Sequence, residues 1–317
     1  MSSPKPIQLG LCCINMTLRK NRPSIFCNRT MRESSVLDDT NYTELFKKIN
    51  QNLDDLLTLI EWNEQHGIRV YRMSSDMFPH FSNPNVPSYT LGPFREQLER
   101  AGKLALKYGH RITFHPGQYN VIGTPREEVF EKTLIELKCH ADILDMMGMG
   151  PDSVMVIHGG GVYSNKSETI KRWYNNFQRL PENVRRRLVL ECCEKSYSIT
   201  DCLEMSKTLD IPVIFDTHHF ECYRTLHPKE TFREPEYYIP LVLETFKRRN
   251  IKPKFHVSEQ GEGRIGHHSD YIETIPNYLL EIPEKYGVNI DIMIEAKHKE
   301  LAIFRLYEKY PFLNCKD

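Results

Sequence analysis

Three stretches in the middle of the chain, SVMVIH (153–158), RLVLE (187–191) and IPVIFD (211–216), decide the fold that we predict. Each stretch is a short aliphatic run that ends in His, Glu or Asp, and longer amphipathic segments separate the three. Short apolar runs of this kind are typical of buried parallel strands. Their alternation with helical patterns predicts an α/β fold.

The same alternation extends outward through the rest of the chain. The strands that we expect are Ile7–Ile14, Ile68–Met73, Arg111–Phe114, Ser153–Ile157, Arg187–Leu190, Ile211–Phe215, Lys252–Val257 and Asn289–Ile294. The helices expected between them include Tyr42–His66, Leu91–Tyr108, Glu127–Met147 and Ser198–Leu209, with Gly67 and Gly109 as helix C-caps. Eight strands in alternation with helices predict a (β/α)8 TIM barrel that spans residues 1–317 as a single domain.

The alternative is a doubly wound open sheet. Such a sheet normally has a glycine-rich turn after its first strand, and Gly10-Leu11-Cys12 is not one. The long loops, Met73–Leu91 and Thr217–Glu236, both follow strands. In a barrel the loops that follow strands build the catalytic face.

Composition excludes several classes of protein. Lys plus Arg balance Asp plus Glu at 42 each, so the chain lacks the overall positive charge that is typical of nucleic-acid binders. This balance does not exclude nucleic-acid binding. A mean hydropathy of -0.51 without a long apolar run argues against a membrane protein. The chain has nine cysteines and no C-x-x-C, and its N-terminal residues Met1–Gln8 show no secretion signal. These features predict reduced thiols and an intracellular location. The sequence has no P-loop or G-x-G-x-x-G, so we expect no nucleotide cofactor.

Ligand-type side chains recur at the ends of six expected strands. They are His115, His158, Glu191, Asp216, His256 and Glu295, and His219, His268 and His80 lie on the loops that follow strands. A single such His is more often a structural residue, and a strand-end Asp or Glu is often a helix N-cap. Six at equivalent positions of a closed barrel are poorly explained in that way, because buried carboxylates and imidazoles need cations. Mixed His and carboxylate ligands suit Zn, Mn or Fe, and the absence of Cys from the set argues against a purely structural zinc site.

Lys254 lies two residues before His256 and therefore points to the same side of the strand. An ion pair with a carboxylate such as Glu191 is the interpretation that the residues favour. Carbamylation, which would make Lys254 an anionic metal ligand, is the alternative. Two or more metal ions held by carboxylates and imidazoles indicate phosphoryl chemistry, because one ion activates water and another stabilises the leaving oxygen.

At these residues the chain resembles the UV-damage endonuclease family, a relative of endonuclease IV within the xylose-isomerase-like barrels. The segments that carry the resemblance run in family order from Leu9 to Lys297, and they are LGLCCIN (9–15), RMSSDMFPH (72–80), FHPGQY (114–119), IHGGG (157–161), LE (190–191), FDTHH (215–219), KFHVS (254–258) and IEAK (294–297). The single pieces are weak, but the ordered set is specific.

The resemblance implies an ATP-independent endonuclease that nicks damaged double-stranded DNA immediately 5′ of a lesion, such as a cyclobutane dimer or a 6-4 photoproduct. Glu191, Lys254 and His80 would be catalytic, with His80 near the phosphate or a third metal. The metal ligands would be His115, His158, Glu191, Asp216, His219, His256, His268, Glu295 and, if carbamylated, Lys254. Two or three divalent ions are implied, manganese first, with magnesium, zinc or cobalt as alternatives, and we expect a monomer.

The family also inserts side chains into the DNA stack beside the lesion. Gln118 and Tyr119 match the main wedge, and Asn15 matches a second probing position, although the pair at 118–119 could equally pack on its own barrel. Leu11 replaces a tyrosine of the family's first motif, so its DNA contact would be apolar. The choice of His268 over His267 is open by one place.

Three other functions remain open at this point. An abasic-site endonuclease would share the ligand set, a sugar isomerase would act on a small substrate without a wedge, and a metal-stabilised scaffold would have no substrate.

Overall fold

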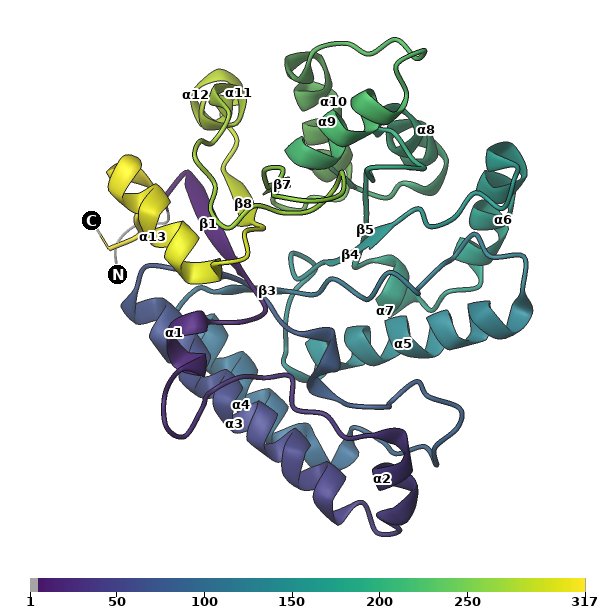
Figure 1. Cartoon of the computed structure of the whole chain (residues 1–317), viewed down its shortest axis with the longest axis vertical. Coiled ribbons are helices and arrows are strands. Elements are labelled where there is room, and N and C mark those ends of the chain that lie inside the picture. Colours follow the sequence, from purple (N-terminus) through teal and green to yellow (C-terminus); the bar gives the residue numbers. More distant parts are fainter. Residues whose placement is uncertain (1–4, 317) are drawn as a thin grey trace.

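Eight short strands alternate with helices in the computed structural model, which describes residues 5–316 (Figure 1). The strands are β1 (Ile7–Cys12), β2 (Val70–Arg72), β3 (Arg111–Thr113), β4 (Met155–His158), β5 (Leu188–Glu191), β6 (Val213–Ile214), β7 (Lys254–Val257) and β8 (Ile290–Ile294). Residues 1–4 and 317, at the ends of the predicted domain, lie outside the described part of the chain. The single-domain organisation stays a prediction.

The strands close into a barrel through two narrow junctions. Parallel pairing gives one sheet of order β3-β2-β1-β8-β7 and a second of order β4-β5-β6. Single parallel bridges join the two sheets, Phe114 to Met155 on one side and Asp216 to His256 on the other. The ring therefore runs through all eight strands in chain order, which confirms the predicted TIM barrel and excludes the open sheet.

Helices connect the strands on the outside of this ring. They are α3 (Thr43–Gln65), α4 (Arg95–Lys107), α5 (Glu127–Met146), α6 (Lys166–Gln178), α7 (Glu182–Arg185), α8 (Ile199–Leu209), α9 (Thr217–Leu226), α10 (Pro235–Arg248), α11 (Asn277–Leu280), α12 (Ile282–Tyr286) and α13 (Lys299–Lys309), with α1 (Met16–Arg19) and α2 (Glu33–Asp38) between β1 and α3. The helices expected from the sequence are present at α3, α4, α5 and α8. Ser198 and Asp201 form a capping box at the start of α8, and Gly67 and Gly109 have the positive φ of helix C-caps.

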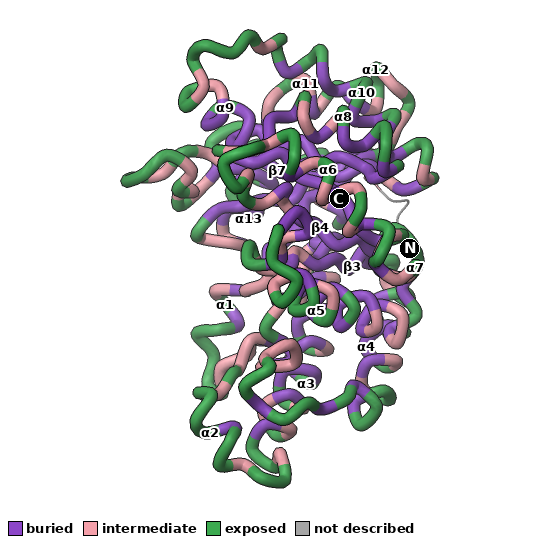
Figure 2. Tube along the Cα trace, turned by 90° about the vertical axis from the view of Figure 1, so that its right-hand side faces the viewer, coloured by how far each residue is buried: buried purple, intermediate pink, exposed green. Residues whose placement is uncertain are grey.

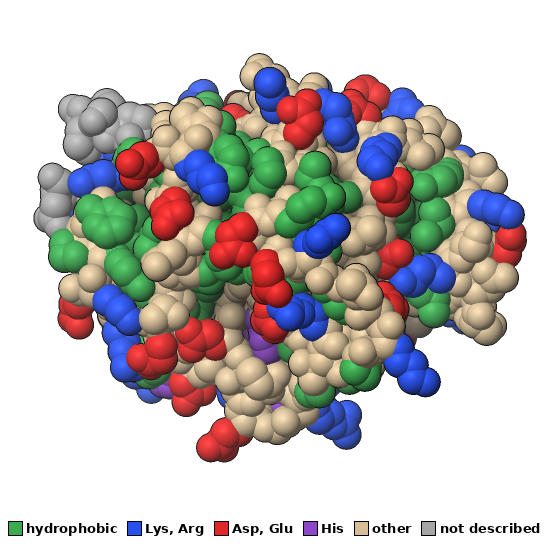
Figure 3. All heavy atoms as spheres, turned by 90° about the horizontal axis from the view of Figure 1, so that it is seen from above, with side chains coloured by type: hydrophobic (Ala, Val, Ile, Leu, Met, Phe, Trp, Pro, Cys, Tyr) green, Lys and Arg blue, Asp and Glu red, His purple; other side chains and the backbone are tan. Residues whose placement is uncertain are grey.

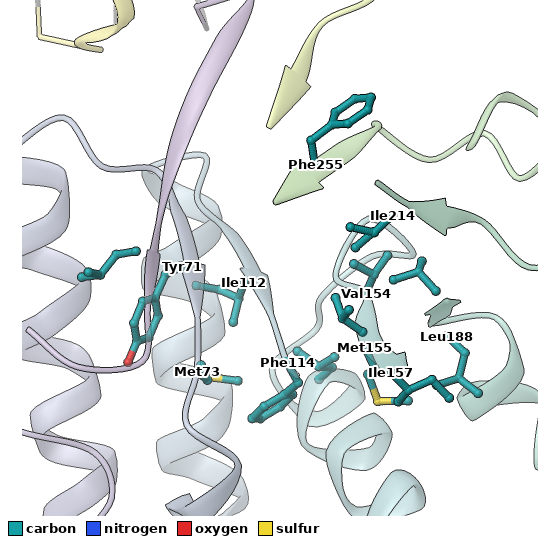
Figure 4. Close-up of a cluster of buried hydrophobic side chains, with 14 of the residues drawn as sticks. Tyr71, Met73, Ile112, Phe114, Val154, Met155, Ile157, Leu188, Ile214 and Phe255 are labelled. Carbon is teal, nitrogen blue, oxygen red and sulfur yellow. The ribbon is translucent and has the colours of Figure 1, made fainter. Parts of the chain in front are cut away.

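Side-chain alternation along the strands separates two apolar clusters. Cys12, Val70 and Met293 form a small cluster of their own, whereas Leu11 and Phe255 belong to the large cluster between strands and helices. Figure 4 shows members of the large cluster around β3, β4 and β5. Because successive side chains point to opposite faces, one set faces the barrel axis and the other faces the helices. The strand-end residues continue the set that faces the axis.

Two connections differ from the sequence expectation. The segment Thr217–Glu236 was expected to be a loop, but it begins with helix α9, which Asp216 caps by accepting a hydrogen bond from His219 N at 2.7 Å. The connection after β1, for which no helix was predicted before Tyr42, carries α1 and α2 before α3 begins. Figure 2 shows buried positions along the strands and exposed ones along the connecting loops. No helix within residues 5–316 is long and apolar enough to cross a membrane.

Candidate metal centre and its rim

Glu191 occupies the centre of a cluster of imidazoles at the carboxyl ends of the strands. Its Oε2 lies 3.0 Å from His115 Nε2 and 3.8 Å from His158 Nε2. Its Oε1 lies 2.9 Å from His256 Nδ1 and 3.2 Å from His219 Nδ1. The parallel register pairs His158 with Glu191 directly, so the backbone of β4 and β5 sets this geometry. One buried carboxylate thus faces four histidines from different parts of the chain.

Glu295 provides a second buried carboxylate beside the first. Its Oε1 lies 3.4 Å from His256 Nδ1, and its Oε2 lies 3.9 Å from His268 Nε2. The third carboxylate, Asp216, is fully buried and lies 3.9 Å from His219 Nδ1 through Oδ2. We call these eight residues the strand-end ring, and its members are His115, His158, Glu191, Asp216, His219, His256, His268 and Glu295.

The ring offers three overlapping groups of candidate ligand atoms. Within each group the atoms lie within 4.8 Å of one another, and the groups are His115–His158–Glu191, Glu191–Asp216–His219 and Asp216–His256–Glu295. Asp216 Oδ2 and His256 Nε2 are buried without a hydrogen-bond partner. Because a buried polar atom without a partner is costly, these orphaned atoms and the His/carboxylate donor set fit divalent cations. Since the groups share Glu191 and Asp216, they would hold neighbouring ions.

The electrostatics of the ring show how strongly these groups interact. Burial opposes ionisation of Glu191, but the imidazoles of His256 and His158 hold its pKa well below the usual value. Burial raises the pKa of Asp216 to about 6; the His219 imidazole opposes this shift and Glu191 adds to it. Burial lowers the pKa of His158 to about 4. His158 is therefore neutral near pH 7 and has a lone pair available for a cation.

Lys254 does not form the ion pair that the sequence favoured. Its side chain is fully buried, and its Nζ donates a hydrogen bond to Thr113 Oγ1 at 3.1 Å. Among residues 5–316 no carboxylate lies within ion-pair distance of Nζ, so the expected pair with Glu191 is wrong. The physical reason is that the four imidazoles already surround Glu191. Burial, together with the nearby cations Arg111 and Arg72, lowers the pKa of Lys254 to about 7.

Sequence reasoning missed two contacts of Glu295. Arg72, at the end of β2, forms an ion pair with Glu295 Oε1, and Cys12 Sγ, at the end of β1, lies 4.0 Å from the same oxygen. The guanidinium of Arg72 lowers the pKa of Glu295 against the effect of burial. Arg72 follows Val70 by two residues, so strand alternation was the signal that could have placed it on the axis. Cys12 also faces the barrel axis. The pattern of ligand-type residues did not indicate that it would lie next to Glu295.

The structure distinguishes the two candidate histidines on the loop after β7. His268 Nε2 faces Glu295, whereas His267 is exposed and its Nδ1 lies 3.2 Å from Glu262 O. His218 was not predicted, yet its ring centroid lies 5.9 Å from that of His268, and burial lowers its pKa to about 4. The structure therefore brings His268 to the ring and places His218 beside it.

His80 lies outside the ring. Its Nε2 donates to Met31 O at 2.8 Å, and its Nδ1 lies 3.1 Å from Asn83 Nδ2. His80 lines a cavity of about 280 Å³ together with Tyr119 and Glu136. No ring residue is a hydrogen-bond partner of His80 in the described chain, so a catalytic role depends on DNA that spans this cavity and the ring.

Gln118 and Tyr119 lie exposed at the tip of the connection between β3 and α5. Tyr119 is 63% exposed, yet its hydroxyl donates to Glu136 Oε1 at 3.2 Å. Glu136 is buried on α5 and also accepts a hydrogen bond from Ser82. The wedge pair is thus exposed at its tip and fixed at one hydroxyl, and Glu136 is a supporting residue that sequence reasoning missed.

The structure buries Leu11 and Asn15, the two residues with further predicted DNA contacts. Leu11 is fully buried in the large apolar cluster, because its position on β1 points it toward the helices. Asn15 is 1% exposed, and its Oδ1 accepts a hydrogen bond from Leu18 N at 2.8 Å as the N-cap of α1. Both side chains support the fold in the absence of DNA, and their DNA contacts stay a prediction.

Comparison with known proteins adds a family assignment to this geometry. The sequence profile of the family described as UV-endonuclease UvdE matches residues 7–315. An Acanthamoeba polyphaga mimivirus protein, provisionally named UV-damage endonuclease, is 38% identical over 96% of this chain and 91% of that protein. The UV-damage endonuclease of Schizosaccharomyces pombe is 38% identical over 98% of this chain, which spans 52% of the yeast protein's length.

Two solved structures resemble this one. The crystal structure of SacUVDE has a TM-score of 0.81 and 29% sequence identity, covering 97% of this chain and 100% of that one. Endonuclease IV from Thermus thermophilus has a TM-score of 0.55 and 13% identity, covering 81% of this chain and 94% of that one. At that identity the second likeness is one of fold alone.

Proposed function

The chain belongs to the UV-damage endonuclease family, a family of DNA-repair enzymes, and from this premise we propose that it nicks UV-damaged double-stranded DNA immediately 5′ of the lesion. The reaction is an ATP-independent, metal-assisted hydrolysis of a phosphodiester. The observation that carries the proposal is the strand-end ring centred on Glu191. Such a ring can hold neighbouring cations next to an exposed loop that can enter DNA.

The ring would hold two or three divalent ions, with manganese as the first candidate. When bound, such ions supply an activated water and a positive charge that stabilises the leaving oxygen. Glu191 and Asp216 each belong to two of the three ligand groups, so they set the relative position of the groups. Arg72 forms a direct ion pair with Glu295 and so favours the ionised carboxylate, which is the form that binds a cation.

We include carbamylated Lys254 among the ligands. A buried amine with a pKa of about 7 has a substantial neutral fraction, which is the form that reacts with CO₂. The reaction forms an N–C bond and releases one proton, and the product is an anion beside the ring. The intact mass of the protein tests this step, because a carbamate adds one CO₂ that acidification removes. An unchanged mass before and after acidification would leave Lys254 as a plain amine.

Outside the ring, Gln118 and Tyr119 would enter the base stack beside the lesion. Filling the space of extruded bases lowers the cost of holding them out of the helix. The hydrogen bond from Tyr119 to Glu136 supports this role, because it orders an exposed aromatic before DNA arrives. His80, which shares a cavity with Tyr119, would contact a phosphate. We expect the enzyme to act as a monomer.

The decisive experiment is nicking of UV-irradiated supercoiled plasmid with Mn²⁺, with and without EDTA. We expect relaxed circles only with irradiated plasmid and only without EDTA. His158→Ala should abolish nicking, whereas His227→Ala, at the opposite end of α9 from Asp216, should not. Full activity of His158→Ala, or nicking that resists EDTA, would contradict the proposal.

A pair of oligonucleotides then tests the lesion. One carries a single cyclobutane dimer and the other a single abasic site, in the same sequence. We expect the dimer to be nicked on its 5′ side with the higher kcat/KM. Preference for the abasic site would instead indicate the endonuclease IV type of activity, with which this chain shares its fold.

A further inference from the structure

The connection after β1 contains a strongly basic stretch in a chain of balanced charge. Residues 16–32 read MTLRKNRPSIFCNRTMR and contain five basic residues and no acidic one, whereas the whole chain has 42 of each sign. Figure 3 shows a different face of the molecule, on which basic and acidic side chains are interspersed. We call residues 16–32 the basic segment.

The basic segment runs along α3, from Glu300 at one end to the cavity of His80 and Tyr119 at the other. At its start, the backbone N–H groups of Met16 and Thr17 donate to Glu300 at 2.8 and 2.7 Å, five residues beyond Glu295. At its end, Met31 O accepts from His80, and Thr30 lines the same cavity as Tyr119. The segment therefore begins near Glu295 of the ring and ends at the cavity that Tyr119 lines.

One of the five cations holds the segment in place. Arg29 forms an ion pair with Asp55 at 2.7 Å and donates to Ser24 O at 2.8 Å. Arg29 N and Phe26 N also donate to Asn52 and Asp55 of α3, at 2.9 and 2.8 Å. The segment is thus fixed on α3, and Arg29 is not available for a ligand.

The other four cations are exposed, and none forms an ion pair with a carboxylate of the described chain. They are Arg19, Lys20, Arg22 and Arg32. Arg19 lies with its guanidinium 5.4 Å from the centre of the Phe26 ring, and Arg22 donates only to the neighbouring Asn21 O at 3.3 Å. Four cations on an anchored segment, none of them held in an ion pair within the described chain, attract an anion with repeated charges.

We propose that the basic segment is the phosphate-binding rim of this enzyme, in which Arg19, Lys20, Arg22 and Arg32 contact the DNA backbone beside the lesion. The inference rests on the proposed function for the identity of the polyanion. Contacts to phosphates position a duplex without reading its sequence, which suits an enzyme that searches undamaged DNA. The anchoring by Arg29 and α3 means that little chain entropy is lost on binding.

The test measures binding of an undamaged duplex in EDTA, so that no cleavage occurs. The variant Arg19→Gln/Lys20→Gln/Arg22→Gln/Arg32→Gln is compared with a control, Arg100→Gln/Lys103→Gln/Lys107→Gln/Lys285→Gln. The control removes the same charge from exposed cations on α4 and α12 that lie near the opposite end of the barrel. Affinity is measured by fluorescence anisotropy between about 50 and 200 mM salt.

We expect the slope of log Kobs against log salt to fall by about 3–4 in the rim variant, because each lost phosphate contact removes about 0.9. The affinity near 0.1 M salt should fall by at least about tenfold. The control variant should keep the slope of the unmodified protein. The single variants Lys20→Gln and Arg22→Gln should each lower the slope by about 0.9, which guards against misfolding of the fourfold variant.

Equal slopes for the rim variant and the unmodified protein would overturn the inference, as would an equal loss in the control. These outcomes are distinct from failure of the proposed function. A protein that binds DNA through this segment but never nicks irradiated plasmid would contradict only the endonuclease. A protein that nicks as proposed while the rim variant binds normally would contradict only the rim. At saturating DNA the rim variant should retain its kcat, because the ring is untouched.

Discussion

The strand-end ring and the loops around its mouth are held in place in different ways. Glu191 and His256 are buried, and the hydrogen-bond register of parallel strands sets their positions. Tyr119 and Arg22 are exposed, and side-chain anchors such as Glu136 and Arg29 hold their loops. Changes in the ring should therefore affect the hydrolytic step, and changes in the loops should affect which DNA is held and how tightly.

The largest effect should come from Glu191→Gln. The amide removes the charge that faces four imidazoles and that belongs to two of the candidate ligand groups. Loss of a residue that only supports a metal ligand typically lowers activity by roughly 10–100-fold. The nicking activity of Glu191→Gln should fall by more than that. Plasmid nicking and the metal content of the dialysed protein measure it. Glu204→Gln, an exposed change on α8, is the control, and near-normal nicking by Glu191→Gln would contradict the role of the ring.

A smaller effect should come from Tyr119→Ala in the loop. Loss of an aromatic that fills the stack should lower kcat/KM on a dimer oligonucleotide by about 10–100-fold, because extruding bases costs a few kcal/mol. Metal content should be unchanged. Phe312→Ala, another exposed aromatic that lies near the C-terminus, is the matched control. If both variants nick equally well, Tyr119 packs only on its own barrel.

The pH dependence of metal binding should sharpen the same comparison. The pKa of Asp216 is raised from 3.8 to about 6, so its protonated form stabilises the ion-free fold below pH 3.8 and this contribution is lost as pH rises through 6. Because a cation binds the ionised form, Mn²⁺ affinity should fall about tenfold per pH unit below 6 for this one linked proton. Calorimetric titrations measure the slope. The Asp216→Asn variant should bind Mn²⁺ more weakly, and its affinity should lack the pH dependence that this proton contributes. A variant whose affinity changes with pH as steeply as that of the unmodified protein would contradict the prediction.

The smallest effect should come from Asn15→Ala at the base of the basic segment. Removal of the N-cap of α1 should cost about 1 kcal/mol of unfolding free energy. Denaturant titration measures it, with Asn165→Ala, the Asn cap of α6, as the matched control. The ratio of kcat/KM for dimer and abasic oligonucleotides should not change. A changed ratio would restore the probing role that the sequence suggested for Asn15.

The ring and the loops also differ in how well the sequence predicted them. The barrel and the strand ends were predictable because a parallel strand buried on both faces has an unmistakable apolar pattern, and its carboxyl end has one position on the catalytic face. The motif resemblance did not indicate that Leu11 would be buried, because strand alternation turns that side chain toward the helices. It did not indicate the N-cap role of Asn15, because a capping side chain and a ligand-binding one look alike in sequence.

The sequence by itself determined the eight-strand barrel and the chemical character of its mouth, because strand periodicity and the order of strands and helices are local properties of the chain. Only the tertiary structure decided which residues meet. It placed Glu191 among four histidines, paired Arg72 with Glu295, left Lys254 without a counter-ion in the described chain and laid the basic segment beside Tyr119. Those contacts join residues far apart in the chain, and closure of the barrel and packing of its loops set them.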